Sequence, residues 1–515
     1  SMLKYYYGVE HKEKFQQLFG DLYIGQNPTE RANRYHILYF EFSRINTQTP
    51  ESTFEGFLSN VREGVSSFFH RYPNFPEKEQ EYILNHPNPA EVLLHLFSAH
   101  GQYGVAPIYL LIDEYDHFAN EILAFHFTSF SEMVSRNGFV RKFYEAIKTA
   151  TGSNTVEYLF VTGVTPITLD SLTSGFNIRT DLSRDFRFNE AMGFTEDDVR
   201  EVIGRLCEGR DCDEGQMMED LRQWYNGYLF SLEGGEAKRI YNPDMVLYFA
   251  VQFKALGKYP KNLIDQNIAS DYGKIRRLFR LKDPESNYEV LERIVQGEGL
   301  SFEVTESFSF ERSFTQADFA SLLYYMGLLT VQGDELDGSI LSVPNYVIWR
   351  LYAGFIAEVL ADRGEMDMEV WNVRQAMLDL AQRNNPEPLF DKLQETLKRL
   401  STRDAIRFDE KHLKMVFVSL VNMVNIYYIR SEREVGKKYA DLMLLERKPL
   451  EPNYQFAFEF KYVKKEDRGK APAVMEEAKA QLRGYLQSEE WAGRENLVGY
   501  AVVLVYDEVF GVERV

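Results

Sequence analysis

One short stretch limits the fold more than any other, the residues PIYLLIDEYDH at positions 107 to 117. Residues 108–112 form a continuous apolar run, and two adjacent acids, Asp113 and Glu114, follow it. A strand buried on both faces shows such a run, whereas a half-exposed strand alternates apolar with polar residues. The pattern therefore predicts a buried parallel strand with acids at its carboxyl end.

Two similar runs lie at residues 37–42 and 157–163, and helical stretches separate the three. The stretches FEGFLSNVREGVSSFFHRY and FVRKFYEAIKTA carry apolar residues at spacings of three and four. Strands that alternate with amphipathic helices build a parallel sheet with helices on its faces. The first part of the chain is therefore predicted to have the α/β architecture of nucleotide-binding domains.

Adjacent acids at the carboxyl edge of such a sheet suit phosphoryl transfer. In P-loop nucleotide hydrolases the first acid helps to hold Mg²⁺ and the second can orient the attacking water. An acidic turn at the end of a strand is the alternative for Asp113 and Glu114. No G-x-x-x-x-G-K-[ST] phosphate loop occurs in the 515 residues, so the sequence predicts weak nucleotide binding or none.

Length and composition favour a soluble, cytoplasmic protein of about three domains, at roughly 150 residues per domain. No stretch reaches the roughly 18 apolar residues that a membrane span needs, and no signal-peptide pattern opens the chain. Cys207 and Cys212 have no second Cys or His pair nearby. This favours reduced, structurally incidental thiols over a disulfide framework or a zinc site.

The net charge of −20 argues against a surface that binds nucleic acid throughout, because phosphates require Lys and Arg. Residues 401–515 carry 19 basic and 19 acidic side chains, so the rest of the chain holds the entire acidic excess. The pairs Lys437-Lys438 and Lys464-Lys465 either contact a phosphate backbone or are solvated loop lysines. The C-terminal part is electrically distinct in any case.

The pattern turns helical from about residue 190 and stays so to about 400. Thr195 is the expected N-cap of a helix with acids in its first turn. Loop signals such as YNGY and QGDELDGSILSVPN predict short helices with one hairpin. After residue 400, strands are predicted at 439–446, 454–463 and 497–507, with a helix at 474–487 packed over a small mixed sheet.

In the predicted strand 454–463, aromatic residues occupy every second position, so Glu459 and Lys461 share the opposite face. A solvated charged face is one interpretation of this pair. The preceding strand brings Asp441 among apolar neighbours, where an unpaired acid is costly. Asp441, Glu459 and Lys461 together suit a metal site: two carboxylates hold Mg²⁺, and the lysine positions or activates a water.

These residues carry a resemblance to a known family. E-x-G-x-x-x-A-D-L from Glu434, then F-E-F-K and Q-L-R-G-Y, resemble the PD-(D/E)XK nuclease fold at the C-terminus of bacterial proteins with an AAA-ATPase-like N-terminal part. LLIDEYD, FVTGVTPIT, SGFNIRTDLS, GFTEDDV, WYNGY, YNPDMV and VPN also stand in that family's order. The resemblance implies an AAA-ATPase-like α/β domain at 1–190, a mainly helical region at 191–400 and a restriction-endonuclease-like α/β domain at 401–515.

The resemblance also implies a set of catalytic residues: Asp441, Glu459, Lys461, Glu434, Gln481 and Tyr485. The first two hold Mg²⁺ or Mn²⁺, and Glu434 is a further acid near the metal. Gln481 and Tyr485 are four residues apart, hence on one helix face. An exposed Gln and a packed Tyr are the alternative for that pair.

In the family, a phosphate loop stands just before a helix that resembles SMLKYYYGVE, the first residues here. The resemblance thus implies a P-loop NTPase-like sheet whose first strand and P-loop are absent, with a tag before a true start as the alternative. Asp113, Glu114 and Thr162 then bind nucleotide and Mg²⁺ in the parent protein, and ATP binds only if the missing segment is present. Arg179 and Arg184 either face the phosphates or pair at the surface.

The expected function is a metal-dependent nuclease that cleaves DNA or RNA and is coupled to an ATPase-like regulatory module. A role in genome defence is an analogy from architecture alone. The alternative is a non-catalytic switch or scaffold whose C-terminal fold binds nucleic acid or a protein partner. Nucleic acid is the expected partner, a homo-oligomer is open, and no membrane association is expected.

Overall fold

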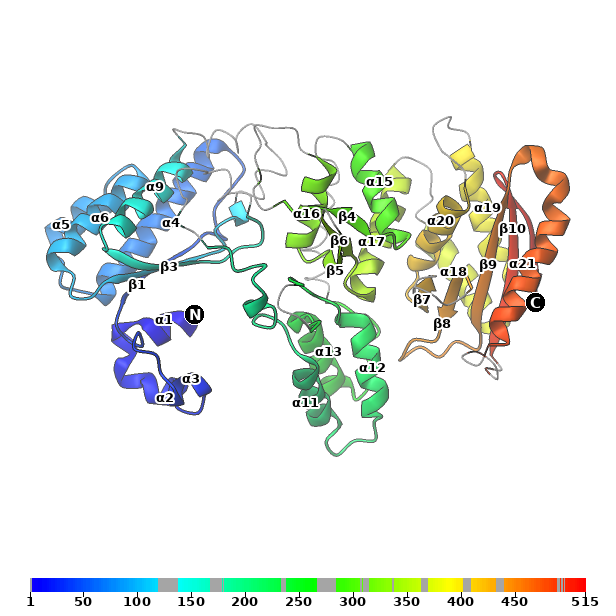
Figure 1. Ribbon diagram of the computed structural model, residues 1–515, viewed down its shortest axis with the longest axis horizontal. Helices are drawn as coiled ribbons and strands as arrows, with labels where there is room; N and C mark the ends of the chain where they lie inside the picture. The colour runs from blue at the N-terminus through cyan, green and yellow to red at the C-terminus, as the bar shows by residue number, and fades with distance from the viewer. Residues whose placement is uncertain are drawn as a thin grey trace. The chain divides into compact units, whose positions relative to one another are not determined.

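The computed structural model describes residues 2–118, 138–166, 178, 180–232, 238–265, 284–305, 308, 315–335, 338–362, 369–401, 409–431, 440–488, 491, 494 and 496–515. The chain forms two compact units. The first contains Ser1–Asp181 and Val304–Met326, and the second contains Leu182–Glu303 and Gly327–Val515 (Figure 1). The three-part division at residues 190 and 400 stays a prediction.

The first unit is built on a three-stranded parallel sheet. Its strands are β1 (His36–Glu41), β2 (Ile108–Asp113) and β3 (Val156–Val161), in the spatial order β1-β2-β3. Its helices are α1 (Met2–Tyr7), η1 (Val9–Lys14), α2 (Phe15–Phe19), α3 (Tyr23–Gln26), α4 (Pro50–Arg71), α5 (Glu77–Leu84), α6 (Pro89–Tyr103), α9 (Phe139–Gly152) and α16 (Gln316–Tyr325). The parallel α/β sheet predicted for this part is confirmed.

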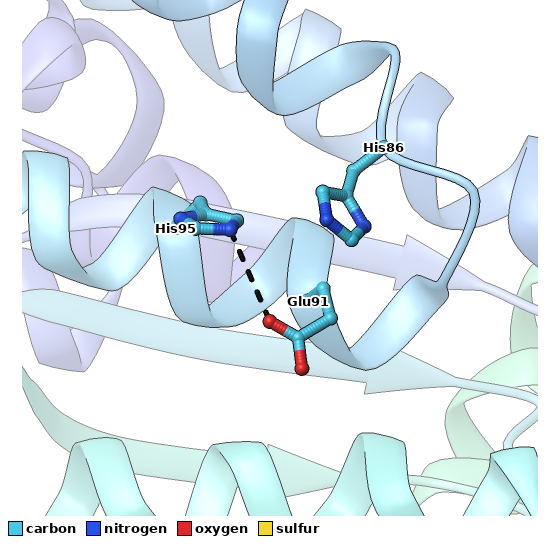
Figure 2. Close-up of side chains that lie close together, drawn as sticks. All are labelled: His86, Glu91 and His95. Carbon is cyan, nitrogen blue, oxygen red and sulfur yellow. Dashed lines mark ion pairs between the residues drawn. The ribbon is translucent and has the colours of Figure 1, made fainter.

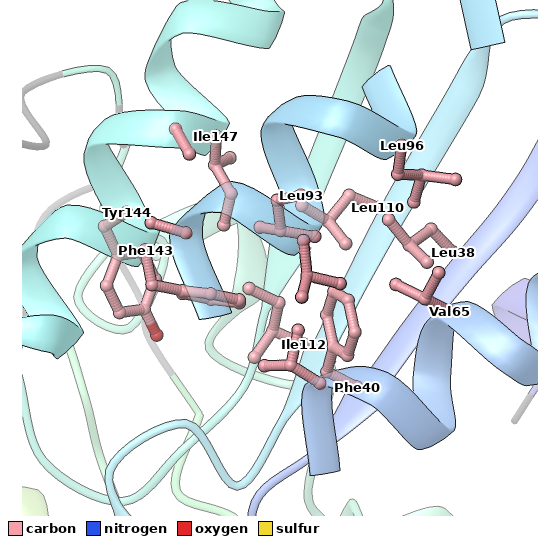
Figure 3. Close-up of a cluster of buried hydrophobic side chains, with 14 of the residues drawn as sticks. Leu38, Phe40, Val65, Leu93, Leu96, Leu110, Ile112, Phe143, Tyr144 and Ile147 are labelled. Carbon is pink, nitrogen blue, oxygen red and sulfur yellow. The ribbon is translucent and has the colours of Figure 1, made fainter. Parts of the chain in front are cut away.

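Apolar side chains from β1 and β2 form the main core of this unit with those of α4, α6 and α9. Figure 3 shows part of this core, including Leu38, Phe40, Val65, Leu93, Leu96, Leu110, Ile112, Phe143, Tyr144 and Ile147. Phe308 and Leu322, from the distant segment that carries α16, belong to the same core. This explains why a segment far along the sequence is part of the first unit.

The second unit begins with helices and a small sheet. Its helices are η3 (Phe186–Phe188), α11 (Glu196–Cys207), α12 (Glu214–Tyr225), α13 (Pro243–Leu256), α15 (Pro284–Val295), α17 (Tyr346–Asp362), α18 (Val370–Arg383), α19 (Glu387–Ser401), α20 (Glu410–Asn422), η5 (Lys465–Lys470) and α21 (Ala471–Leu486). The small sheet has the order β4-β6-β5, from β4 (Leu300–Phe302), β5 (Thr330–Glu335) and β6 (Gly338–Ser342). Thr195 caps α11 as predicted, because its side chain accepts a hydrogen bond from the backbone of Asp198.

The expectation of two free thiols is wrong, because Cys207 and Cys212 form a disulfide. Cys207 is the last residue of α11, and the chain turns back after it through Gly209, whose φ is +71°. This turn brings the two Cα atoms to 5.8 Å, within the range that a disulfide spans. The spacing alone did not reveal the turn.

The C-terminal part of the second unit contains a five-stranded mixed sheet in the order β11-β10-β9-β8-β7. Its strands are β7 (Tyr428–Ser431), β8 (Leu442–Leu445), β9 (Gln455–Val463), β10 (Leu497–Val505) and β11 (Glu508–Arg514). β9 and β10 are parallel and the other neighbouring pairs are antiparallel. The mixed sheet and its helix are confirmed, whereas β7 and β11 were not predicted.

Both faces of this sheet are covered (Figure 1). On one face, Phe417 of α20 packs against Phe458 and Phe460, with ring centroids 5.4 and 5.0 Å apart. On the other face, α21 packs against β9 and β10. The solvated charged face considered for β9 is therefore wrong at Glu459, whose exposed fraction is 3%.

Among the described helices, none combines the length and the apolar character that crossing a bilayer requires.

Candidate metal and nucleotide sites

The pairing of two strands brings the predicted acids of the C-terminal sheet together. β8 and β9 are antiparallel, and Leu442 pairs with Phe458. Asp441 directly precedes β8, beside this pair, and its charge is close enough to Glu459 to raise the pKa of Glu459 by repulsion. Both side chains are buried.

Both oxygens of Asp441 already have hydrogen-bond partners. Its Oδ1 accepts a hydrogen bond from Lys414 Nζ at 2.6 Å, and its Oδ2 accepts one from the backbone N–H of Phe460 at 2.8 Å. Lys414 Nζ also lies 2.9 Å from Oε1 of Glu410, one turn earlier on α20. Asp441 is thus anchored both to the central strand and to a helix.

Only one of the two carboxylate oxygens of Glu459 has a hydrogen-bond partner. Its Oε1 accepts a hydrogen bond from Lys461 Nζ at 3.0 Å, whereas its buried Oε2 has no hydrogen-bond partner. Burial raises the pKa of Glu459 to about 7, and repulsion from Asp441 adds to the rise, while Lys461 and Lys414 oppose it. The site therefore has a deficit of positive charge at Glu459.

Both lysines remain charged. Burial by itself would lower the pKa of Lys414 and of Lys461, but ion pairs with Asp441 and Glu459 outweigh burial and raise it. Two ammonium groups thus flank two carboxylates in a largely buried cluster.

This donor set fits a divalent metal. Mg²⁺ prefers carboxylate oxygens, and Glu459 Oε2 is a buried acceptor without a partner. A cation between the two carboxylates would relieve the repulsion that raises the pKa of Glu459. The structure therefore brings Asp441, Glu459 and Lys461 into one cluster, while their catalytic role stays a prediction.

For the other residues predicted for this site, no described hydrogen bond links them to Asp441, Glu459 or Lys461. Glu434 and the Lys437-Lys438 pair lie outside the described residues. Gln481 is half-buried on α21, and its buried Oε1 has no hydrogen-bond partner. Tyr485, also on α21, packs against a hydrophobic cluster that includes Ala457 of β9. No described hydrogen bond joins Gln481 to Glu459.

Sequence reasoning missed Lys414 and Glu410. They are four residues apart on a helix, a spacing that indicates an ordinary surface ion pair. Only the packing of α20 against the sheet brings Lys414 to Asp441. Lys464 and Lys465, at the end of β9, are exposed, and Lys465 lies 5.6 Å from the ring centroid of Tyr506.

The predicted acids of the first unit lie at the carboxyl edge of its sheet. Asp113 is the last residue of β2 and pairs with Glu41 of β1, an acid that sequence reasoning did not single out. Thr162, just after β3, donates a hydrogen bond to Oδ1 of Asp113, and Tyr39 donates one to Oδ2 at 3.4 Å. Asp113 and Thr162 are thus adjacent, as parallel neighbours that end at one edge must be.

Glu114 differs from Asp113 in its exposure and backbone. Its φ is +52°, in the left-handed region that non-glycine residues rarely adopt, and its side chain is 42% exposed. Its Oε2 lies 3.7 Å from Nδ1 of His117. Partial burial raises the pKa of Glu114, against the pull of His117. A non-glycine residue in this region is strained, and the role of Glu114 stays a prediction.

Asp116, which sequence reasoning also missed, is fully buried behind this edge. Its carboxylate accepts hydrogen bonds from the backbone N–H groups of Val164 and Thr165, and from the Thr165 hydroxyl. It thereby shapes the loop after β3 that carries Thr162. Arg184 is half-buried in the second unit, and Arg179 lies outside the described residues.

Comparisons with known proteins match the N-terminal and the C-terminal parts of the chain to two families. Residues 1–173 match the family model described as "Predicted AAA-ATPase", and residues 408–513 match that of the PD-(D/E)XK nuclease superfamily. The chain thus has an AAA-ATPase-like N-terminal region and a C-terminal PD-(D/E)XK nuclease domain.

One curated relative and one solved structure are similar to the chain. An uncharacterized protein in the vnfD 5' region of Azotobacter chroococcum mcd 1 is 37% identical over 111 residues, which cover 21% of this chain and 19% of that relative. The Walker-type ATPase paby2304 of Pyrococcus abyssi has a TM-score of 0.36 and 12% identity, with coverage of 61% of this chain and 83% of that one. A likeness at that level bears on neither fold nor function.

Proposed function

We propose that the C-terminal domain hydrolyses phosphodiester bonds of DNA or RNA at the cluster of Asp441, Glu459 and Lys461. The observation that carries this proposal is the pair of buried carboxylates, Glu459 on β9 and Asp441 just before β8. Glu459 has a buried oxygen without a hydrogen-bond partner beside the ammonium group of Lys461. Mg²⁺ or Mn²⁺ bound there would polarise a phosphate oxygen and lower the pKa of a bound water.

The residues of the chain have separable tasks in this proposal. Asp441 and Glu459 hold the cation, and the backbone N–H of Phe460 keeps the Asp441 carboxylate aimed. Lys461, whose Nζ is 3.0 Å from Glu459, positions the attacking water and stabilises the negative charge that develops on phosphate. Glu434, Gln481 and Tyr485 retain their proposed supporting roles.

The AAA-ATPase-like region is proposed to regulate the nuclease. Asp113 and Glu114 would act on nucleotide-bound Mg²⁺ and on the attacking water, and Thr162 would link Asp113 to the phosphate. That a phosphate loop precedes residue 1 in a longer protein stays a prediction, and ATP binding depends on it.

A cleavage assay tests the nuclease proposal. The purified chain is incubated with Mg²⁺ or Mn²⁺ and labelled single- and double-stranded DNA and RNA, beside Asp441→Ala and a matched Asp391→Ala control at an exposed position of α19. We expect cleavage by the parent and control chains and none by Asp441→Ala. Equal cleavage by all three would show that a contaminant or another site is responsible.

A second candidate function is a fold that binds nucleic acid or a partner without cutting. The observation that favours it is that Lys414 occupies Oδ1 of Asp441, where a metal would bind. Binding measured by electrophoretic shift, with no cleavage in either metal and no change in binding for Asp441→Ala, would support this alternative.

A further inference from the structure

Three potential metal ligands lie together on the first unit. They are His86, in the turn between α5 and α6, and Glu91 and His95, on α6 (Figure 2). One ligand atom from each lies within 4.8 Å of the other two. All three side chains are partly exposed, so a cation can reach them from solvent.

The backbone holds these side chains in place without help from a ligand. Glu91 and His95 are four residues apart on α6 and therefore share one face of that helix. The carbonyl of His86 accepts a hydrogen bond from Arg62 Nη2 at 2.9 Å, and its backbone N–H donates to Ile83 at 3.3 Å. The turn is thus attached to α4 as well as to α5, which fixes the backbone position of His86.

The three side chains do not satisfy one another. Glu91 Oε2 and His95 Nε2 are 3.9 Å apart, an ion pair when the imidazole is protonated but too long for a hydrogen bond (Figure 2). Nδ1 of His86 is buried and has no hydrogen-bond partner. His95 Nε2 has a contact of 3.4 Å with the hydroxyl of Tyr82, at the long limit of a hydrogen bond. Lone pairs of two imidazoles and a carboxylate are therefore available at one point.

The composition of the set selects the class of metal. Imidazole nitrogen suits Zn²⁺ and its transition-metal neighbours, whereas Mg²⁺ requires oxygen ligands. Zinc bonds of about 2.0 to 2.2 Å place tetrahedral ligand atoms roughly 3.3 to 3.5 Å apart. Side-chain movements of about an ångström would bring the three ligand atoms to that spacing. Two neutral imidazoles leave the charge of the cation uncompensated, and the carboxylate of Glu91 neutralises part of it.

The geometry points to a zinc site formed by His86, Glu91 and His95, with water at the fourth position. This site is independent of the carboxylates at Asp441 and Glu459 and of the function proposed for them. By linking the α5–α6 turn to the helix that follows it, the bound metal stabilises the first unit.

Zinc content tests this site. The full chain carrying Asp441→Asn and Glu459→Gln, which removes the other acid cluster, is incubated with ZnCl₂, dialysed against metal-free buffer and analysed by mass spectrometry of the metal. We expect one bound zinc per chain. In this background His95→Ala should lose that equivalent, whereas His70→Ala, at an exposed histidine of α4, should retain it.

The same retained zinc in His95→Ala and in His70→Ala would overturn the proposal, as would no retained zinc in the starting chain. Glu91→Gln keeps the size of the side chain and its helix, so it separates ligand loss from unfolding. Its far-ultraviolet circular dichroism should be unchanged while its zinc is lost. Cobalt(II) should give the strong visible absorption of a four-coordinate site in the starting chain and in His70→Ala, and not in His95→Ala or Glu91→Gln.

Discussion

Nζ of Lys414 lies 2.6 Å from Oδ1 of Asp441, although Lys414 is on α20 and Asp441, 27 positions later, directly precedes β8. The ammonium group neutralises a carboxylate that stands opposite a second buried acid. It also occupies the oxygen that a metal would use. Lys414 therefore neutralises Asp441 in this structure and would compete with a metal bound there.

Replacing Lys414 by Met should lower stability in the absence of metal by roughly 1 to 3 kcal/mol, because Asp441 loses a charged partner in a buried position. Mg²⁺ should restore part of that loss. Urea unfolding with and without Mg²⁺ measures both effects. Lys411→Met, at an exposed lysine of the same helix, should change stability little.

Replacing Lys461 by Met should reduce the cleavage rate at saturating metal by about 100-fold or more, because the transition state loses a charged donor. The matched control is Lys464→Met, at the exposed end of β9. Single-turnover cleavage under identical metal and substrate concentrations gives the comparison. Equal rates for the two variants would remove Lys461 from the mechanism.

His36 makes the stability of the first unit depend on pH. Burial, with repulsion from His100, lowers the pKa of His36 from 6.5 to about 4. Below pH 6.5 His36 is protonated in the unfolded chain but stays neutral in the folded chain until about pH 4. The free energy of unfolding therefore decreases as pH falls from about 6.5 to 4. The loss from His36 alone should be at most about 3 kcal/mol.

Urea unfolding at pH 7 and pH 4.5 checks this sign. His36→Phe preserves an aromatic ring against Tyr72, on which the imidazole stacks at 4.0 Å, and should show a smaller loss on acidification. His70→Phe, at an exposed position, should keep the parent slope. Parallel slopes for all three chains would contradict the assignment to His36.

The disulfide predicts a simple chemical result. Denatured but unreduced protein should contain no titratable thiol, and reduction should release two, from Cys207 and Cys212. Loop-closure entropy for so short a loop implies a stabilisation of roughly 2 kcal/mol, so reduction should lower the unfolding midpoint of the second unit. Thiol titration before and after reduction decides whether the bond forms in solution.

Several elements were predictable because the signal is local. The apolar run 108–112 identified β2, and the aromatic alternation at 454–463 identified β9, both to within a residue or two. Those strands carry Asp113 and Glu459 at the positions that the sequence indicated. A strand that is buried on one face or on both can be recognised from the pattern of its own apolar residues.

The remaining features depend on contacts between distant segments. Nothing near Lys414 indicates that α20 will bring it to Asp441. The burial of Glu459 requires α21 to cover the charged face of β9, which the alternating pattern of that strand alone cannot show. Glu41 joins Asp113 only through strand register. Such neighbours follow from tertiary packing, which local sequence does not encode by itself.

The membership of α16 in the first unit has a practical meaning for dissecting the protein. The chain passes between the two units three times, since Val304–Met326 returns to the first. A fragment that starts at residue 1 and ends anywhere between residues 182 and 303 lacks Phe308 and Leu322, which belong to the core of the first unit. The first unit is therefore an assembly of two separated segments, and a fragment intended to reproduce it must join residue 181 to residue 304 through a new linker.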